Sequence, residues 1–146
     1  MLKEVSVIGL MPMRIKILRP NGPESDCKFP GDHKPNSRHI GLYDSGFLAG
    51  IGSVIQESED GQMDQGVWRI RGVAVEGSYR KQGIGSKIVE DLVKHVKAQG
   101  GKKIWCNART SAIRLYQKHE FSVASDEFIL PVIGPHFRMK RNLHTC

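Results

Sequence analysis

A stretch rich in glycine and positive charge carries the clearest chemical signal in this chain. Residues 73–93 read VAVEGSYRKQGIGSKIVEDLV, a short apolar strand followed by a loop and a long amphipathic helix. Such a loop directs free backbone N–H groups and the positive end of the helix at one point. Gly83 and Gly85 let an anion approach the backbone because they lack a Cβ, and Arg80 and Lys81 add positive charge. The segment therefore predicts a binding site for a phosphate or pyrophosphate.

Two familiar phosphate-binding motifs do not match this loop. A P-loop needs G-x-x-x-x-G-K-[ST], but Gly85 is followed by Ser86 and Lys87. A dinucleotide fingerprint needs G-x-G-x-x-G/A, and its last position is Ile88 here. What remains is R-x-x-G-x-G from Arg80 to Gly85. Taken alone, this pattern also fits an ordinary helix start with capping glycines.

A second segment, residues 104–121, reads IWCNARTSAIRLYQKHEF and combines a strand with a short helix. The strand ends at Asn107, and the helix places Ala112 and Tyr116 on one face because they are four residues apart. Tyr116 has two interpretations at this point. It is either an amphipathic aromatic packed on the core or a phenol that takes part in chemistry.

The cysteines and histidines do not predict a metal site. The three cysteines, Cys27, Cys106 and Cys146, form no CxxC pair, and the six histidines are scattered without metal-ligand spacing. Cys106 lies in an apolar run and is expected to be a buried, inert thiol. We therefore expect no metal, no disulfide framework and a reducing, cytoplasmic compartment.

Hydrophobic periodicity predicts alternating strands and helices that position these segments. We expect strands at 3–8, 39–43, 47–56, 67–75, 103–107, 121–123, 128–130 and 136–140, and helices at 83–99 and 110–119. Residues 10–18 fit both a strand and a helix; a helix with Pro12 in its first turn is favoured. Residues 20–37 hold four of the seven prolines and predict a long loop, a kind of segment that is often functional. This order implies a mixed sheet with helices packed on it.

Length and composition limit the number of domains and the kinds of partner that the chain can have. The chain has 146 residues, 39% of them hydrophobic, which predicts one domain, 1–146, with a real core. Its apolar runs are too short to span a membrane, and no signal peptide is expected. The net charge of +7 suggests an anionic partner. A nucleic acid is not expected, because the basic residues are not interleaved with stacking aromatics and no known motif appears.

Together the two segments resemble the GNAT superfamily of N-acetyltransferases, of the bacterial single-domain type whose substrates are unassigned. The hallmark is a strand, then [RQ]-x-x-G-x-[GA] and a long helix, then a strand with an Asn near its end and a helix with a Tyr ahead of a Phe. Here these features are Val73–Val75, Arg80–Gly85, Asn107, Tyr116 and Phe121. One departure is Glu120, where many members have Gly, which affects the expected geometry of the helix end.

The resemblance implies an α+β fold layered α/β/α, with a mostly antiparallel sheet, a central splayed parallel strand pair and helices on both faces. It implies direct acetyl transfer from acetyl-CoA to a primary amine, with Tyr116 as the general acid that protonates the thiolate. A backbone N–H near Val75 would polarise the acetyl carbonyl. The matching cofactor-binding positions are Val73, Ala74, Val75, Arg80, Lys81, Gln82, Gly83, Ile84, Gly85, Ser86 and Asn107.

The sequence leaves the base and the acceptor open. Glu76 and His136 are candidate bases, but a solvated turn residue and a structural hydrogen bond are alternatives for them, and a water chain could serve instead. Arg69 and Arg71 share a face of a regular strand and would favour an acidic substrate, unless they are simply solvated. The acceptor is a small-molecule or peptide amine of unknown identity. A homodimer is also left open, and the alternative function is a non-catalytic acyl-CoA sensor on the same fold.

Overall fold

The computed structural model describes residues 1–20, 22–61, 64–131 and 133–143. Their strands form one sheet in the order β1-β2-β3-β4-β5-β8-β6, with β7 paired to β8. The strands are β1 (Leu2–Glu4), β2 (Arg38–Asp44), β3 (Phe47–Gln56), β4 (Val67–Val75), β5 (Lys103–Arg109), β6 (Ser122–Val123), β7 (Phe128–Leu130) and β8 (Gly134–Asn142). The α-helices are α1 (Val7–Met13), α2 (Ile84–Ala98) and α3 (Ile113–Lys118).

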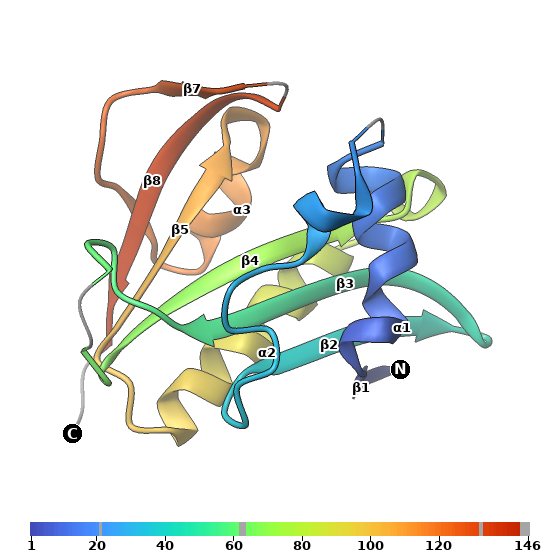
Figure 1. Cartoon of the computed structure of the whole chain (residues 1–146), viewed down its shortest axis with the longest axis horizontal. Helices are drawn as coiled ribbons and strands as arrows, with labels where there is room; N and C mark the ends of the chain where they lie inside the picture. Colours follow the sequence, from blue (N-terminus) through green and yellow to red (C-terminus); the bar gives the residue numbers. More distant parts are fainter. Residues whose placement is uncertain (21, 62–63, 132, 144–146) are drawn as a thin grey trace.

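The two central strands separate along their length. Among the described strand pairs only β4 and β5 run parallel, and they pair over three residues, Val67–Arg69 with Lys103–Trp105. Beyond Arg69 and Trp105 the two strands diverge, and the sheet opens into a V (Figure 1). The predicted fold class, a mostly antiparallel sheet with a splayed parallel pair, is confirmed.

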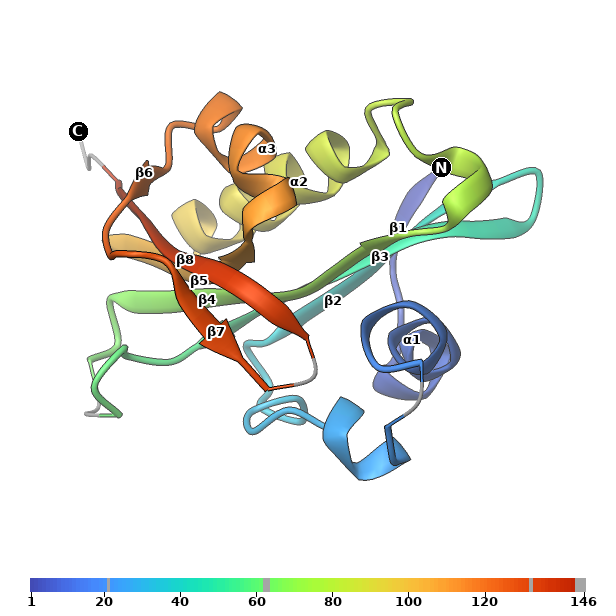
Figure 2. The same ribbon diagram turned by 90° about the horizontal axis from the view of Figure 1, so that it is seen from above.

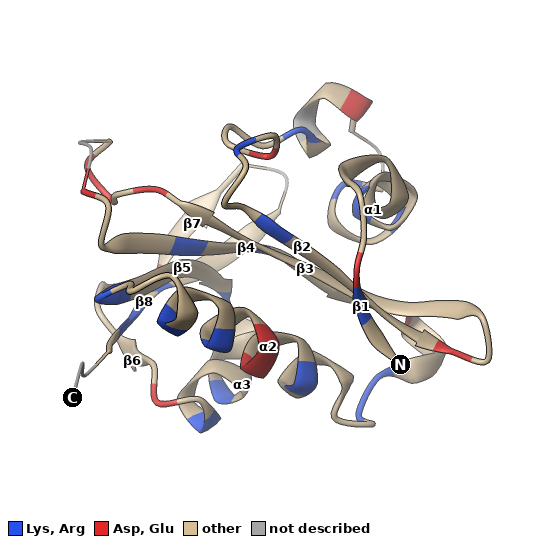
Figure 3. Ribbon diagram, turned by 90° about the horizontal axis from the view of Figure 1, so that it is seen from below, with Lys and Arg blue, Asp and Glu red and all other residues tan. Residues whose placement is uncertain are grey.

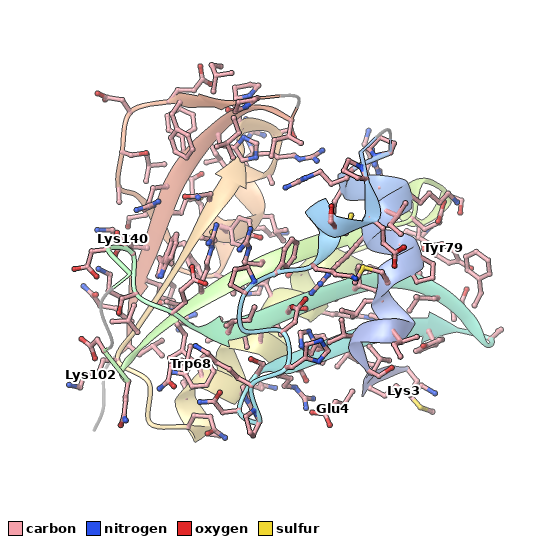
Figure 4. The ribbon with its side chains drawn as sticks, viewed as in Figure 1. Lys3, Glu4, Trp68, Tyr79, Lys102 and Lys140 are labelled. Atoms are coloured by element: carbon pink, nitrogen blue, oxygen red, sulfur yellow. The ribbon has the colours of Figure 1, made fainter. Side chains whose placement is uncertain are left out.

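Helices cover both faces of the sheet (Figure 2). One face carries α2 and α3, and the opposite face carries α1 and the loop at 20–37; we call them the α2 face and the α1 face. The predicted apolar stripe of α2 is buried as expected: Ile84, Ile88, Val89, Leu92, Val93 and Val96. Trp68 of β4 packs among them, with its ring edge-on to His95 at 5.7 Å (Figure 4). The larger part of the core therefore lies between the sheet and α2.

The α1 face combines a smaller apolar cluster with a buried polar network. Leu10, Met13, Ile51 and Ala74 pack together. Beside them Arg14, whose side chain is fully buried, donates to Asp32 Oδ2 at 2.8 Å and Oδ1 at 3.1 Å. Arg14 also donates to Ser53 Oγ at 3.0 Å, and Ser53 Oγ lies 2.6 Å from His39 Nδ1. This network ties the loop at 20–37 to the sheet.

Most element predictions are confirmed, and the differences have local causes. The strand predicted at 3–8 ends at Glu4, because Ser6 accepts a hydrogen bond from the Gly9 N–H and caps α1. The favoured helix at 10–18 is confirmed, but it starts at Val7, so Pro12 lies in its second turn, and residues 14–18 form a π-helical turn. Short 3₁₀ turns cover Glu24–Cys27, Gly77–Tyr79 and Thr110–Ala112.

Within the described residues, no helix has the length and apolar character needed to cross a membrane. The same residues contain no cluster of three or more His, Cys, Asp and Glu side chains that could hold a metal ion.

Candidate active site

A cavity of about 150 Å³ lies where β4 and β5 separate. Its wall combines side chains from β4 and β5 with Tyr116 of α3, Phe29 of the loop at 20–37, and His136 at the start of β8. Segments from both faces of the sheet thus meet at the opening of the V (Figure 1).

An irregularity in β4 sets which side chains reach each face. The register with β3 passes from Ser53↔Arg71 to Ile51↔Ala74, so Gly72 and Val73 lie opposite one residue of β3. Gly72 has φ +65°, and a Cβ there would lie 3.1 Å from the Phe29 ring. Such a bulge reverses the alternation of side chains and is common beside active sites. As a result Arg71 lies on the α1 face, whereas Val73 and Val75 pack with the core on the α2 face.

The loop before α2 contains two residues with left-handed backbone conformation. Lys81 has φ +66° and Gly83 has φ +79°, and alternation of this kind is found where successive backbone N–H groups bind an anion. No side chain caps α2, and no acidic residue lies in its first turn. Arg80, Lys81, Gln82 and Gly83 are exposed, and Ser86 Oγ is held by His119 Nε2 at 2.8 Å. The Ile84 side chain is buried in the core, as its place in the apolar stripe predicts, so only its backbone N–H is available to a ligand.

Tyr116 lines the cavity from the α2 face. It is 6% exposed and packs edge-on against Phe121, with 5.5 Å between the ring centroids. Burial, with a smaller contribution from the Cys106 thiol, raises the pKa of Tyr116 well above its ordinary value. Tyr116 is therefore packed on the core, as the first interpretation predicts, and it also lines the cavity; its part in the chemistry stays a prediction.

Asn107, near the end of β5, also lines the cavity. Its Oδ1 accepts a hydrogen bond from Arg138 Nε at 3.0 Å, which fixes the side-chain amide. The amide N–H₂ is then the part of Asn107 that can donate to a ligand. The neighbouring Cys106 is buried as expected, and burial raises the pKa of its thiol to about 12.

The two candidate bases differ in position. Glu76 is held by Lys16, with Nζ 3.0 Å from each carboxylate oxygen, and it is not among the described residues that line the cavity. His136 does line the cavity and is 4% exposed. Its Nδ1–H donates to the Gly134 carbonyl at 2.8 Å, so Nε2 of the neutral ring carries a lone pair.

Arg69 and Arg71 both line the cavity, and neither is simply solvated. Arg69 pairs with Glu57 at 2.8 Å and lies over the Trp105 ring, 4.4 Å from its centroid. Arg71 lies over the Phe29 ring at 4.1 Å. Burial, together with the charge of Arg69, lowers the pKa of Arg71 to about 10.

Among the charged and aromatic residues that line the cavity, sequence reasoning missed Arg19, Phe29 and Arg109. Arg19 and Phe29 come from a segment without periodicity, and Arg109 lies two residues beyond the predicted end of β5. The one indication for Phe29 was its place in a long loop, a kind of segment that is often functional.

Comparisons with known proteins agree with the fold. A model described as the acetyltransferase (GNAT) family matches residues 13–121. The uncharacterized N-acetyltransferase YitI of Bacillus subtilis (strain 168) is 32% identical over 98% of this chain and 96% of the relative. The crystal structure of Escherichia coli ElaA has a TM-score of 0.79 at 18% identity and covers 97% of this chain and 98% of ElaA. An aminoglycoside 6'-N-acetyltransferase complexed with coenzyme A has a TM-score of 0.71 at 18% identity, with coverages of 97% and 96%.

The family model spans most of the chain, and YitI is similar over almost its full length. The two crystal structures share the fold. The resemblance found in the sequence is thus confirmed, and the chain belongs to the acetyltransferase (GNAT) family.

Proposed function

We propose that this chain transfers an acetyl group from acetyl-CoA directly to a primary amine of a small-molecule or peptide acceptor. The observation that carries the proposal is the cavity between β4 and β5, with Tyr116 in its wall. Membership of an acetyltransferase family supports the reaction. The coenzyme A bound to a neighbour of the same fold supports a CoA thioester as the donor.

The donor site follows β4 and the loop after it. The β4 backbone at Val73, Ala74 and Val75 would bind the pantetheine arm, because β4 has no strand partner on its β5 side there. Ala74 contributes only its backbone, since its side chain packs in the cluster on the α1 face. The N–H groups from Gln82 to Ser86 would hold the pyrophosphate.

The absence of a side-chain cap and of acidic residues in the first turn of α2 makes that helix start suitable for an anion. Arg80 and Lys81 add positive charge beside it, and the Asn107 amide donates from the opposite strand.

The reaction requires one group that gives a proton to the departing sulfur and another that removes a proton from the amine nitrogen. The amine nitrogen forms a bond to the acetyl carbon, and the carbon–sulfur bond breaks. An N–H from the bulged part of β4 stabilises negative charge on the carbonyl oxygen. The Tyr116 Oη–H then protonates the departing sulfur. Its raised pKa keeps the proton in place across the neutral range until negative charge develops on the sulfur.

The acceptor must reach the cavity as a neutral amine. Arginines in the cavity wall favour that form, because nearby positive charge lowers the pKa of an ammonium group. His136 Nε2 is the lining group that would accept the remaining proton as the bond forms.

The proposal is tested by replacing Tyr116 with Phe and measuring CoA thiol release over a panel of amines. Tyr116→Phe should lower kcat by about 10²- to 10⁴-fold, because it removes the proton donor and keeps the packing on Phe121. The acetyl-CoA Kd, measured by calorimetry, should stay within about twofold of the wild-type value.

Tyr43→Phe, at a half-buried tyrosine of β2 that is not among the cavity-lining residues, is the matched control and should keep full activity. Unchanged kcat in Tyr116→Phe would remove Tyr116 from its role. Acetyl-CoA binding by the wild type without thiol release on any amine would favour the sensor instead.

A further inference from the structure

The cavity wall carries an unusual excess of positive charge. Four arginines line it, namely Arg19, Arg69, Arg71 and Arg109, and none of the described lining residues is an aspartate or glutamate. A site that binds a simple ammonium group would instead be expected to offer a carboxylate. The wall is therefore suited to a ligand that brings negative charge of its own.

The four arginines differ in how their charge is balanced. Arg69 pairs with Glu57 at 2.8 Å. Arg19 Nη1 and Arg109 Nη2 both donate to the Leu18 carbonyl, at 3.0 and 3.3 Å, which satisfies a donor but leaves the charge uncompensated. Within the described part of the chain Arg71 has no hydrogen-bond or ion-pair partner. It lies over the Phe29 ring, and the carboxylate whose charge reaches it, that of Glu57, is already bound by Arg69.

A comparison with Arg14 shows what Arg71 lacks. Both guanidinium groups lie 4.1 Å from the centroid of the Phe29 ring. Arg14 is bound by both oxygens of Asp32, which is the usual way in which a buried guanidinium is stabilised. No residue among those described does this for Arg71. Arg71, which is half-buried, therefore keeps a guanidinium that an anion from outside the chain could bind.

The position of Arg71 separates this anion from the phosphates of the donor. Arg71 faces Phe29 on the α1 face, whereas the loop from Gln82 to Ser86 leads into α2 on the opposite face (Figure 2). The cavity is also smaller than the roughly 300–1,000 Å³ of sites for drug-sized ligands. Its dimensions suit a small acceptor.

We propose that the acceptor is a small molecule that carries a carboxylate as well as the primary amine, and that Arg71, assisted by Arg19 and Arg109, binds that carboxylate. This inference rests on the proposed function and names the class of acceptor. The planar guanidinium of Arg71 can bind both carboxylate oxygens, which would direct the amine toward Tyr116 and His136.

The first test compares matched acceptors by CoA thiol release. Each amino acid or ω-amino acid in the panel is paired with its neutral primary amide and with its phosphonate analogue. We expect kcat/KM to be at least about tenfold higher for the carboxylate than for the amide. Equal or better use of the amides or phosphonates would overturn the carboxylate assignment while leaving acetyl transfer intact. If no amine is acetylated although acetyl-CoA binds, the proposed function fails and the acceptor assignment falls with it.

The second test uses Arg71→Met, which removes the charge but keeps an apolar stem against Phe29. It should lower kcat/KM for carboxylate acceptors by about 10- to 100-fold, mainly through KM, lower kcat/KM for the amides far less, and leave the acetyl-CoA Kd unchanged. Its melting temperature should equal or exceed that of the wild type, since an uncompensated charge is removed.

Arg14→Met is the contrasting variant at the same ring and should melt at a lower temperature, because it leaves Asp32 buried without its partner. Lys97→Met, on the exposed end of α2, makes the same change in net charge and should alter neither measurement. An equal loss of activity on acids and amides in Arg71→Met would overturn the proposal.

Discussion

The end of α3 fixes the position of Tyr116. The Phe121 N–H donates to the Tyr116 carbonyl and the Glu120 N–H to the Gln117 carbonyl, both at 3.1 Å, which is the bonding pattern of a Schellman motif. The motif normally takes glycine where the chain adopts a left-handed conformation, and here Glu120 occupies it with φ +67°. The departure seen in the sequence therefore leaves the helix end intact and introduces backbone strain instead.

Glu120→Gly should raise the free energy of unfolding by about 1 kcal/mol, because glycine adopts positive φ without a steric penalty. The ion pair of Glu120 with Arg141 is exposed on the Glu120 side and offsets only a small part of this gain. Urea denaturation measures the change. Glu120→Ala removes the same ion pair but keeps a Cβ, so a glycine variant no more stable than the alanine variant would contradict the strain.

The residues of the candidate site differ in how far the sequence could predict them. Asn107 and Tyr116 lie within a strand and a helix whose spacing can be read from the sequence, so both could be predicted as candidate site residues. The partners that define their environment could not, because Arg138 reaches Asn107 through the β5–β8 register. Phe29 reaches the cavity only through the fold of the loop at 20–37.

At the scale of elements, periodicity was informative wherever one face is buried. The bounds of β4 and β7 match the prediction, and α2 differs by one residue at each end, because their apolar patterns reflect packing. The bulge at Gly72 was not predictable, since the apolar pattern of β4 does not mark the extra residue. For the same reason the separation of Arg71 from Val73 onto opposite faces could not be derived from strand alternation.

The contact between α2 and β3 depends on two glycines of β3. A Cβ at Gly52 would lie 2.5 Å from Ile88 Cγ2, and one at Gly50 would lie 2.8 Å from Ile84 Cγ2. Gly52→Ala should therefore lower the free energy of unfolding by about 1–3 kcal/mol, because α2 has to move away from the sheet. Thermal unfolding measures the loss. Gly77→Ala, where a Cβ would meet no atom within 4 Å, is the control, and equal stability of both variants would argue against close packing here.

At the scale of the whole molecule, positive charge is widely distributed. Lys and Arg residues occur on α2, on α3 and along the sheet (Figure 3). The net charge of +7 thus has several local explanations: the arginines of the cavity, the loop before α2, and a cluster at the closed end of the V. In that cluster Glu59 binds Lys103, Arg138 and Lys140, and Figure 4 labels Lys140 at this end of the molecule.

Two carboxylates should make the free energy of unfolding depend on pH in the acid range. Burial by itself raises the pKa of Asp32, but hydrogen bonds from Arg14 and the Phe29 N–H outweigh it and hold the pKa below its ordinary value. For Glu59, burial is likewise outweighed by Lys103 and Lys140. Because both pKa values are lower in the folded state, their stabilisation is complete above about pH 5 and is lost as the pH falls through the folded pKa values.

Asp32→Asn should remove the Asp32 part of this dependence and cost about 3–5 kcal/mol at pH 7, since Arg14 remains buried without a countercharge. Urea unfolding at pH 7 and at pH 3.5 measures both effects. The difference between wild type and variant should shrink at the lower pH. A difference that is equal at the two pH values would contradict the assigned ionisation.

The order of strands in the sheet has a consequence for how the chain folds as it is synthesised. β1 to β4 and α2 are complete by residue 98 and make most of their contacts with one another. β5 gains its second neighbour only after residue 142 has been made, since β8 lies beside it. Until then the outer edge of β5 is open to other extended chains. The cavity between β4 and β5 therefore cannot be complete until β8, which carries His136, has been made and pairs with β5.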